Sequence, residues 1–126
     1  MSLPPYADWE TPEDLAMRAL KLLEKVRETG GKVRKGVNEV TKSVERGQAK
    51  LVLIALDVNP PEIVMHLPAL CKEKGVPYLF VPSKADLGKA AGIKRPASSA
   101  AVVDPGKASD ELMKIIAEVK ELMMKK

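Results

Sequence analysis

Hydrophobic residues recur at helical spacing near the start of the chain and predict its first helix. The pattern follows Thr11-Pro12-Glu13-Asp14, in which Thr11 suits the N-cap and Pro12 the first helical position. It stops at Gly30-Gly31. The apolar positions between these limits are Leu15, Ala19, Leu22, Leu23 and Val26. We therefore expect one helix here, with one face in the core.

Continuous apolar runs later in the chain predict strands that are covered on both faces. The clearest is KLVLIAL, from Lys50 to Leu56, which contains β-branched residues and no polar alternation. Shorter candidates are KVRKG at 32–36, VPYLFV at 76–81 and SAAVV at 99–103.

Further helical patterns separate these strands. RKGVNEVTKSVERG, from Arg34 to Gly47, contains a second helix. A third is expected after Asn59, which suits an N-cap. Pro68 falls inside that third pattern, so it either kinks the helix or begins a second short one.

The alternation continues to the end of the chain. Ser83 and Asp86 form a predicted capping box before a short helix, and apolar residues from Leu112 to Met123 mark a closing helix. Alternating elements with doubly covered strands predict an α/β fold, a three-layer α-β-α sandwich. Because no linker or repeat divides the chain, we expect residues 1–126 to form one domain, with residues 1–10 as an N-terminal leader.

Composition excludes a disordered chain, and the charge adds one hint. Of the 126 residues, 45% are hydrophobic and 30% are charged. Lys and Arg number 21 against 17 Asp and Glu, and the net charge of +4 weakly favours an anionic partner such as nucleic acid. Without a signal-peptide core or a membrane-spanning run, we expect a cytoplasmic protein that does not bind membranes.

Neither the single cysteine nor the single histidine suggests a metal site. Cys71 has no cysteine to pair with, and its apolar neighbours favour a buried structural thiol. His66 has no acidic or thiol neighbour at ligand spacing. We expect no metal and no cofactor.

Enzyme signatures are absent from the sequence. It contains no dinucleotide-binding, P-loop or nucleophile-elbow motif. The segment DLGKAAG has the wrong glycine spacing for a phosphate loop and favours a short helix ending at Gly92. Asp57 follows a strand, where α/β proteins often place functional groups, but a turn or capping role is an equal alternative. We expect no catalytic residue, and a small nucleotide-using enzyme is the less favoured alternative.

One side of the second helix carries side chains that suit RNA. At about 100° per residue, valines 37, 40 and 44 share the core side, and the outward side carries Asn38, Glu39, Lys42 and Arg46. Ionised Glu39 only accepts hydrogen bonds, so it matches the N–H donors of a guanine edge. Lys42 and Arg46 suit phosphates, and Gly36 permits close backbone approach. The alternative is a solvated helix face on which Glu39 favours the helix dipole.

A second basic cluster lies between Pro82 and Pro96, in PSKADLGKAAGIKRP. Against the single acid Asp86 it holds four cations: Lys84, Lys89, Lys94 and Arg95. Ile93 and Pro96 add apolar surface, a combination that suits an unstacked RNA base. An ordinary basic surface loop is the alternative. Two such patches in one small basic domain favour nucleic-acid binding.

Both stretches resemble a known family. KGVNEVTKSVERGQAKLVLIA is similar to the KG-x-NE-x-TK-x-(V/L)-x-RG signature of the kink-turn-binding L7Ae ribosomal protein family, and PPEIVMHLPALCKEKGVPYLFVPSKADLGKAAG continues the similarity. Within this family, the chain is most similar to the archaeal large-subunit members and to their eukaryotic box C/D relative. The resemblance implies a mixed four-stranded sheet inside the sandwich. It also implies binding to the kink-turn, an RNA helix–bulge–helix with tandem sheared G·A pairs.

The resemblance also implies roles on the second helix. Asn38, Glu39 and Lys42 would contact the sheared guanines. Gly36 would allow close backbone approach, and Arg46 or Lys35 would contact phosphate.

A pocket for the flipped-out bulge nucleotide is implied as well. Ile63 and Lys84 would help form it, and the loop that closes over it would be Ile93, Lys94, Arg95 and Pro96. Asn59 stands where an acidic residue often lines the pocket in the family. The segment GIKRPASSA is closer to the eukaryotic loop than to the common archaeal one, which bears on tolerance of related RNA loops.

The implied function is that of a non-catalytic protein of the large ribosomal subunit that also nucleates guide ribonucleoproteins. The implied partners are kink-turns in large-subunit rRNA, in box C/D and H/ACA guide RNAs and in ribonuclease P RNA, together with a Nop-domain scaffold protein and fibrillarin. The free protein is expected to be a monomer. A structural protein confined to the ribosome is the alternative.

Overall fold

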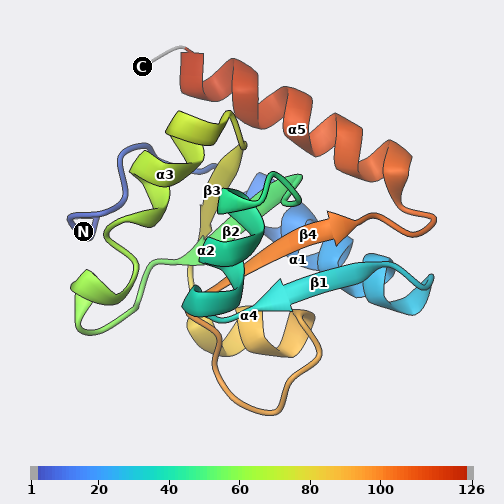
Figure 1. Ribbon diagram of the computed structural model, residues 1–126, viewed down its shortest axis with the longest axis horizontal. Helices are drawn as coiled ribbons and strands as arrows, with labels where there is room; N and C mark the ends of the chain where they lie inside the picture. The colour runs from blue at the N-terminus through green and yellow to red at the C-terminus, as the bar shows by residue number, and fades with distance from the viewer. Residues whose placement is uncertain (1–2, 125–126) are drawn as a thin grey trace.

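Helices and strands alternate in the order that the hydrophobic pattern predicts. The computed structural model describes residues 3–124. In chain order its elements are α1 (Glu13–Glu28), β1 (Lys32–Lys35), α2 (Val37–Glu45), β2 (Leu51–Ala55), the 3-10 helix η1 (Pro61–Ile63), α3 (Leu67–Lys74), β3 (Tyr78–Val81), α4 (Lys84–Ala90), β4 (Ser99–Asp104) and α5 (Ser109–Met124) (Figure 1).

One four-stranded sheet has the order β1-β4-β2-β3. Strands β2 and β3 are parallel, and β4 is antiparallel to both β1 and β2. Strands β1, β2 and β3 therefore run in one direction, and their carboxyl ends lie at the same end of the sheet as the start of β4. The mixed four-stranded sheet is confirmed.

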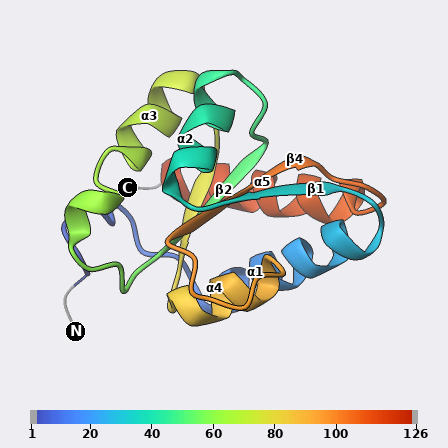
Figure 2. The same ribbon diagram turned by 60° about the horizontal axis from the view of Figure 1, so that its bottom comes forward.

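Helices cover both faces of the sheet. Helices α2 and α3 lie on one face, α1 and α4 lie on the other (Figure 2), and α5 packs against α1. Every residue of β2, from Leu51 to Ala55, is 0% exposed, because the strand lies inside the sheet and between the helical layers. The three-layer α-β-α sandwich is thus confirmed.

The beginning of α1 differs from the prediction. Thr11 does not cap the helix; Pro12 occupies the cap position, and its side chain makes no capping hydrogen bond. The Thr11 hydroxyl instead accepts a hydrogen bond from the backbone N–H of Phe80 at 3.0 Å. Strand β3 is at the edge of the sheet, so this N–H has no neighbouring strand on that side and takes a side-chain acceptor.

The predicted Asn59 cap is also wrong. Only the short turn η1 follows it, with Pro60 at the cap position and no side-chain cap. Pro68 begins a separate helix, because it lies in the first turn of α3, where a missing N–H costs nothing. The Ser83 cap is confirmed by its side chain, which accepts from the Asp86 N–H at 3.1 Å.

The segment before α1 packs into the core. Tyr6 and Trp9 are only 3% and 5% exposed. Their rings lie 6.3 and 6.5 Å from the ring of Phe80. The Tyr78 hydroxyl donates to Asp8 Oδ2 at 2.6 Å and fixes the segment between the two aromatic residues. The expected leader is therefore bound to the sheet from Tyr6 onward.

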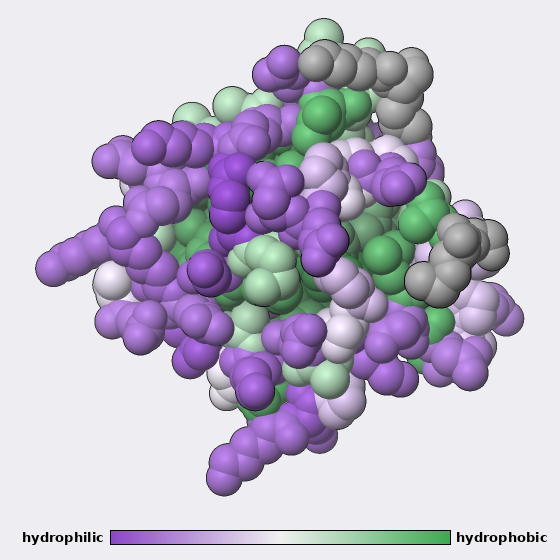
Figure 3. Space-filling model, turned by 180° about the vertical axis from the view of Figure 1, so that it is seen from behind, coloured by the Kyte–Doolittle hydropathy of each residue, from purple (hydrophilic) through white to green (hydrophobic). Residues whose placement is uncertain are grey.

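The face hidden in Figure 1 is mostly hydrophilic, and its hydrophobic side chains show in small separate areas (Figure 3). Within residues 3–124, no helix combines the length and the apolar character needed to cross a membrane.

Candidate functional site

A cavity of about 550 Å³ lies at the end of the sheet where β1, β2 and β3 finish and β4 begins. Segments that follow each of these ends contribute to it, as the geometry of parallel strands requires. Its lining consists of Lys35, Gly36, Val58, Asn59, Ile63, Lys84, Ile93, Arg95, Pro96, Ala97 and Ser98. Eight of the residues proposed from the sequence thus come together here, from four segments of the chain.

The cations of this cavity have no acidic partner. Lys35, Lys84 and Arg95 line it, and no carboxylate in the described part of the chain is within 4.0 Å of their charged groups. Three positive charges therefore face one hollow without internal neutralisation. Such an arrangement attracts an anion.

Gly36 makes the turn from β1 into α2. Its φ of +88° is in the region that side-chain-bearing residues rarely adopt. Its N–H donates to the Ser99 carbonyl, and its own carbonyl accepts from Val40, both at 3.0 Å. The first turn of α2 is thereby fixed beside the cavity.

Helix α2 has the predicted orientation. Val40 and Val44 are 0% exposed, and Val37 packs partly buried against the core. The residues expected to face outward are all exposed: Asn38, Glu39, Lys42 and Arg46. They do not line the cavity but continue its surface along the helix. Lys42 Nζ lies 3.8 Å from Glu39 Oε2, a contact between two side chains that are more than half exposed.

The loop between α4 and β4 is pressed onto α4. A Cβ on Gly88 would lie 2.1 Å from the carbonyl oxygen of Arg95, so only glycine permits this approach. Backbone hydrogen bonds at 3.0 Å, from Ile93 to Gly88 and from Ala97 to Lys84, hold the two ends of the loop. Lys94 does not line the main cavity. It lines a neighbouring hollow together with Lys89, Arg95 and Pro96.

The turn after β2 is fixed by side chains on two sides. Asp57 Oδ1 accepts from the backbone N–H of Lys84 at 2.8 Å and so caps the start of α4. The capping role considered for Asp57 is the one that the geometry gives. On the other side, the Tyr6 hydroxyl donates to the Ala55 carbonyl at 2.6 Å and accepts from the Val58 N–H at 3.2 Å.

Sequence reasoning missed three residues of the cavity: Val58, Ala97 and Ser98. Each is small or apolar and carries no charge that marks it. Their positions held the signal, because Val58 comes three residues after β2 ends, and Ala97 and Ser98 come directly before β4 begins. The rule that sites form at the carboxyl ends of parallel strands would have found Val58.

Known proteins are similar to this chain in sequence and in architecture. The family model described as "Ribosomal protein L7Ae/L30e/S12e/Gadd45 family" matches residues 17–112. The chain belongs to this family. The L7Ae fold of the chain is similar to that of a solved structure, the Giardia lamblia 15.5kD RNA binding protein, at 36% sequence identity and a TM-score of 0.88. The match covers 95% of this chain and 99% of that chain.

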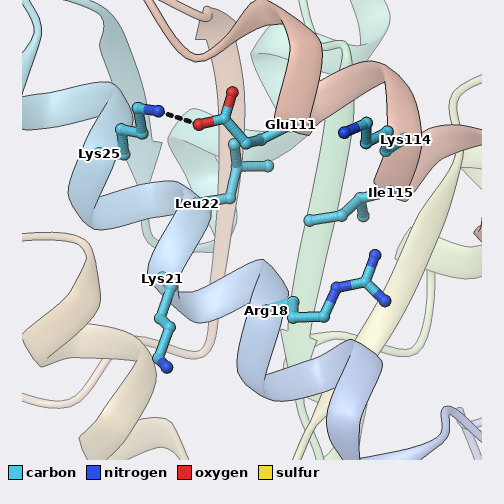
Figure 4. Close-up of a pocket in the computed structure, with 7 residues that line it drawn as sticks. All are labelled: Arg18, Lys21, Leu22, Lys25, Glu111, Lys114 and Ile115. Carbon is cyan, nitrogen blue, oxygen red and sulfur yellow. Dashed lines mark hydrogen bonds and ion pairs between the residues drawn. The ribbon is translucent and has the colours of Figure 1, made fainter.

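A second cavity, of about 260 Å³, lies between α1 and α5 of this L7Ae-family chain (Figure 4). Leu22 and Ile115 provide apolar surface, and four cations line it: Arg18, Lys21, Lys25 and Lys114. Here two of the cations are paired, Lys25 with Glu111 and Arg18 with Glu118. Lys21 points away from α5 in Figure 4. This groove therefore offers an anion far less than its count of basic residues indicates.

The remaining polar candidates have structural contacts in the L7Ae fold. Cys71 is fully buried, and burial raises the pKa of its thiol to about 12, so it stays protonated at neutral pH. The buried thiol is confirmed. His66 Nε2 lies 2.8 Å from the Thr41 hydroxyl. Across residues 3–124, acidic, histidine and cysteine side chains nowhere form a group of three that could hold a metal ion.

Proposed function

We propose that the chain binds RNA and recognises the kink-turn through the cavity and the adjoining outward face of α2. The observation that carries this proposal is the set of three unneutralised cations around a cavity that also has apolar walls. Ile63 and Ile93 provide apolar surface beside Lys84. Phosphates need the first feature and an unstacked base needs the second. Membership of the L7Ae family, and the RNA binding named for the Giardia protein, support the proposal.

On α2, Asn38, Glu39 and Lys42 contact the sheared G·A pairs in this proposal. A carboxylate repels phosphates, so at an RNA-binding surface the role that suits Glu39 is to accept hydrogen bonds from base N–H groups. Among residues 3–124 its one ion pair, to Lys42, is long at 3.8 Å and exposed, so the carboxylate is accessible. Gly36 allows close approach of the RNA backbone, and Arg46 and Lys35 neutralise phosphates.

In the cavity, Asn59, Ile63 and Lys84 hold the bulge nucleotide. The loop closes over it with four residues: Ile93, Lys94, Arg95 and Pro96. An amide at position 59 adds no negative charge to this wall, which leaves the three cations available to the sugar-phosphate backbone.

Binding only the bent RNA stabilises the kink by the difference in affinity between the bent and extended forms. The bent RNA then presents a surface for later proteins. We extend the proposal to kink-turns in large-subunit rRNA and in box C/D and H/ACA guide RNAs, where a Nop-domain scaffold and fibrillarin assemble afterwards, and to ribonuclease P RNA.

Gel shifts with two RNAs test the class of the interaction. One RNA contains a kink-turn, and the other has its G·A pairs converted to Watson–Crick pairs. We expect the second RNA to bind more weakly by about 1–3 kcal/mol for each base contact that is lost. Equal affinity for both would overturn recognition of the kink-turn and leave only general RNA binding.

Purification of the tagged protein from native extract, followed by sequencing of the bound RNA, tests the cellular partners. Guide RNAs together with rRNA are the expected result. Recovery of rRNA alone would favour the alternative, a structural protein confined to the ribosome.

A further inference from the structure

The end of β2 is held by a side chain from the segment before α1. Tyr6 is 3% exposed, and its hydroxyl makes two hydrogen bonds with the backbone there: it donates to Ala55 and accepts from Val58. Val58 lines the candidate RNA cavity, and Asn59 follows it in the same wall. One buried hydroxyl thus fixes the backbone from which a cavity wall begins.

The opposite side of this turn is fixed without the amino-terminal segment. The Leu56 N–H donates to the Val81 carbonyl at 2.9 Å, and Asp57 accepts from the Lys84 N–H at 2.8 Å. These two bonds tie the turn to β3 and α4. No other bond of the Val58 N–H is present among residues 3–124, so at this point of the turn the backbone hydrogen bond depends on Tyr6.

This role needs the hydroxyl of the phenol, and an aromatic ring of the same size without a hydroxyl cannot replace it. Burial raises the pKa of Tyr6, so the hydroxyl keeps its proton at neutral pH and can donate to a carbonyl while it accepts from an N–H. Phenylalanine would fill the same space but leave both backbone groups without a partner.

We propose that Tyr6 is a positioning residue for base recognition, which it supports by holding the cavity wall of Val58, Asn59 and Ile63 from behind. This inference rests on the proposed function, because it assumes that the cavity receives the bulge nucleotide. Tyr6 lies outside residues 17–112, which match the family model, so the pattern of the family does not supply it.

The test compares Tyr6→Phe with a matched variant, Tyr78→Phe. Tyr78 also binds the amino-terminal segment through its hydroxyl, but it lies at the start of β3 and lines a different hollow, with Cys71 and Met123. Affinities are measured for two kink-turn RNAs that differ only at the bulge, where one carries a base and the other an abasic residue. The readout is the ratio of the two affinities, which an unfolded fraction of protein leaves unchanged.

For Tyr6→Phe we expect that ratio to fall by about three- to tenfold, the effect of one lost hydrogen-bonding group. Tyr78→Phe should keep the wild-type ratio even if it melts earlier. In free Tyr6→Phe, the Val58 amide should also exchange with solvent faster than in wild type.

Two results would overturn the inference. If wild type prefers the base-bearing RNA and Tyr6→Phe keeps the same preference, Tyr6 has no positioning role. If wild type itself does not distinguish the two RNAs, the proposed nucleotide pocket is wrong, and the role of Tyr6 is wrong with it.

Discussion

The candidate RNA cavity and the groove between α1 and α5 contain similar numbers of basic residues but differ in what the acids around them do. In the α1–α5 groove, Lys25 and Arg18 are bound to Glu111 and Glu118, and these carboxyl groups come from the same face of α5. In the cavity at the end of the sheet, Lys35, Lys84 and Arg95 have no carboxylate within ion-pair distance in the described residues. The same side-chain type thus holds two helices together in one place and is left for an outside partner in the other.

The acidic residues also differ in whether they are paired. Glu111 and Glu118 face cations across a helix interface, and the pKa of each is lowered by its partner, Lys25 or Arg18. Within the described part of the chain, the ion pairing of Glu39 is limited to a long contact with Lys42 on its own helix. A count of charges cannot separate structural from functional residues, whereas the state of pairing can.

The largest effect is expected from Glu39→Ala. Binding to the kink-turn should weaken by about 1–3 kcal/mol, the discrimination carried by one bidentate base contact, and binding to plain duplex RNA should stay nearly unchanged. Glu111→Ala serves as the control from the groove and should alter neither affinity. Equal losses on both RNAs would show that Glu39 does not read bases.

A smaller effect is expected from Lys84→Gln. It should lower the salt dependence of binding, as the slope of log K against log salt, by roughly 0.7–0.9 units, because one phosphate contact is lost. Lys114→Gln removes the same charge from the groove, and its slope should match that of wild type. A similar change in both variants would mean that net charge, rather than the cavity, attracts the RNA.

Ile93→Ser should act only on the bulge nucleotide. Ile93 packs partly buried against the core and lines the cavity, so a polar replacement removes apolar contact with the base. We expect a loss of about threefold, or roughly 0.7 kcal/mol, near the value of one buried methylene group. Insensitivity of this loss to the presence of the bulge would reject the pocket assignment.

The smallest effect is expected on thermal stability, from removal of the two ion pairs in the groove between α1 and α5. Because Lys25 and Arg18 lower the pKa of Glu111 and Glu118 below the ordinary 4.5, the pairs stabilise the fold above that pH and lose their effect as pH falls through the lowered values. The double variant Glu111→Gln/Glu118→Gln should melt about 1–3 °C lower at pH 7. The gap should narrow as the pH falls from 7 through the lowered pKa values, and a gap that is independent of pH over the acid range would exclude titration of these groups as its cause.

Local patterns predicted the layers and the face of α2 because those features repeat within a few residues. The valines of α2 fixed its orientation, and Ser83 with Asp86 fixed the start of α4. Tyr6 could not be assigned in this way, since its partners lie 49 and 52 residues away. Thr11 misled for the same reason, because its hydroxyl serves Phe80, 69 residues further along the chain. Side chains that bind distant backbone leave no periodic signal nearby.

The tight contact at Gly88 constrains how this protein can diverge. The loop that follows is bound to α4 at Ile93 and at Ala97, which leaves three positions between the two anchors, and a single methyl group at Gly88 would collide with the loop backbone. An inserted residue would change the backbone path that brings the Arg95 carbonyl against Gly88, whereas an exchanged side chain at positions 94–96 would not. We therefore expect descendants that accept a different set of RNA loops to differ in the identity of these three residues and to conserve the length of the loop.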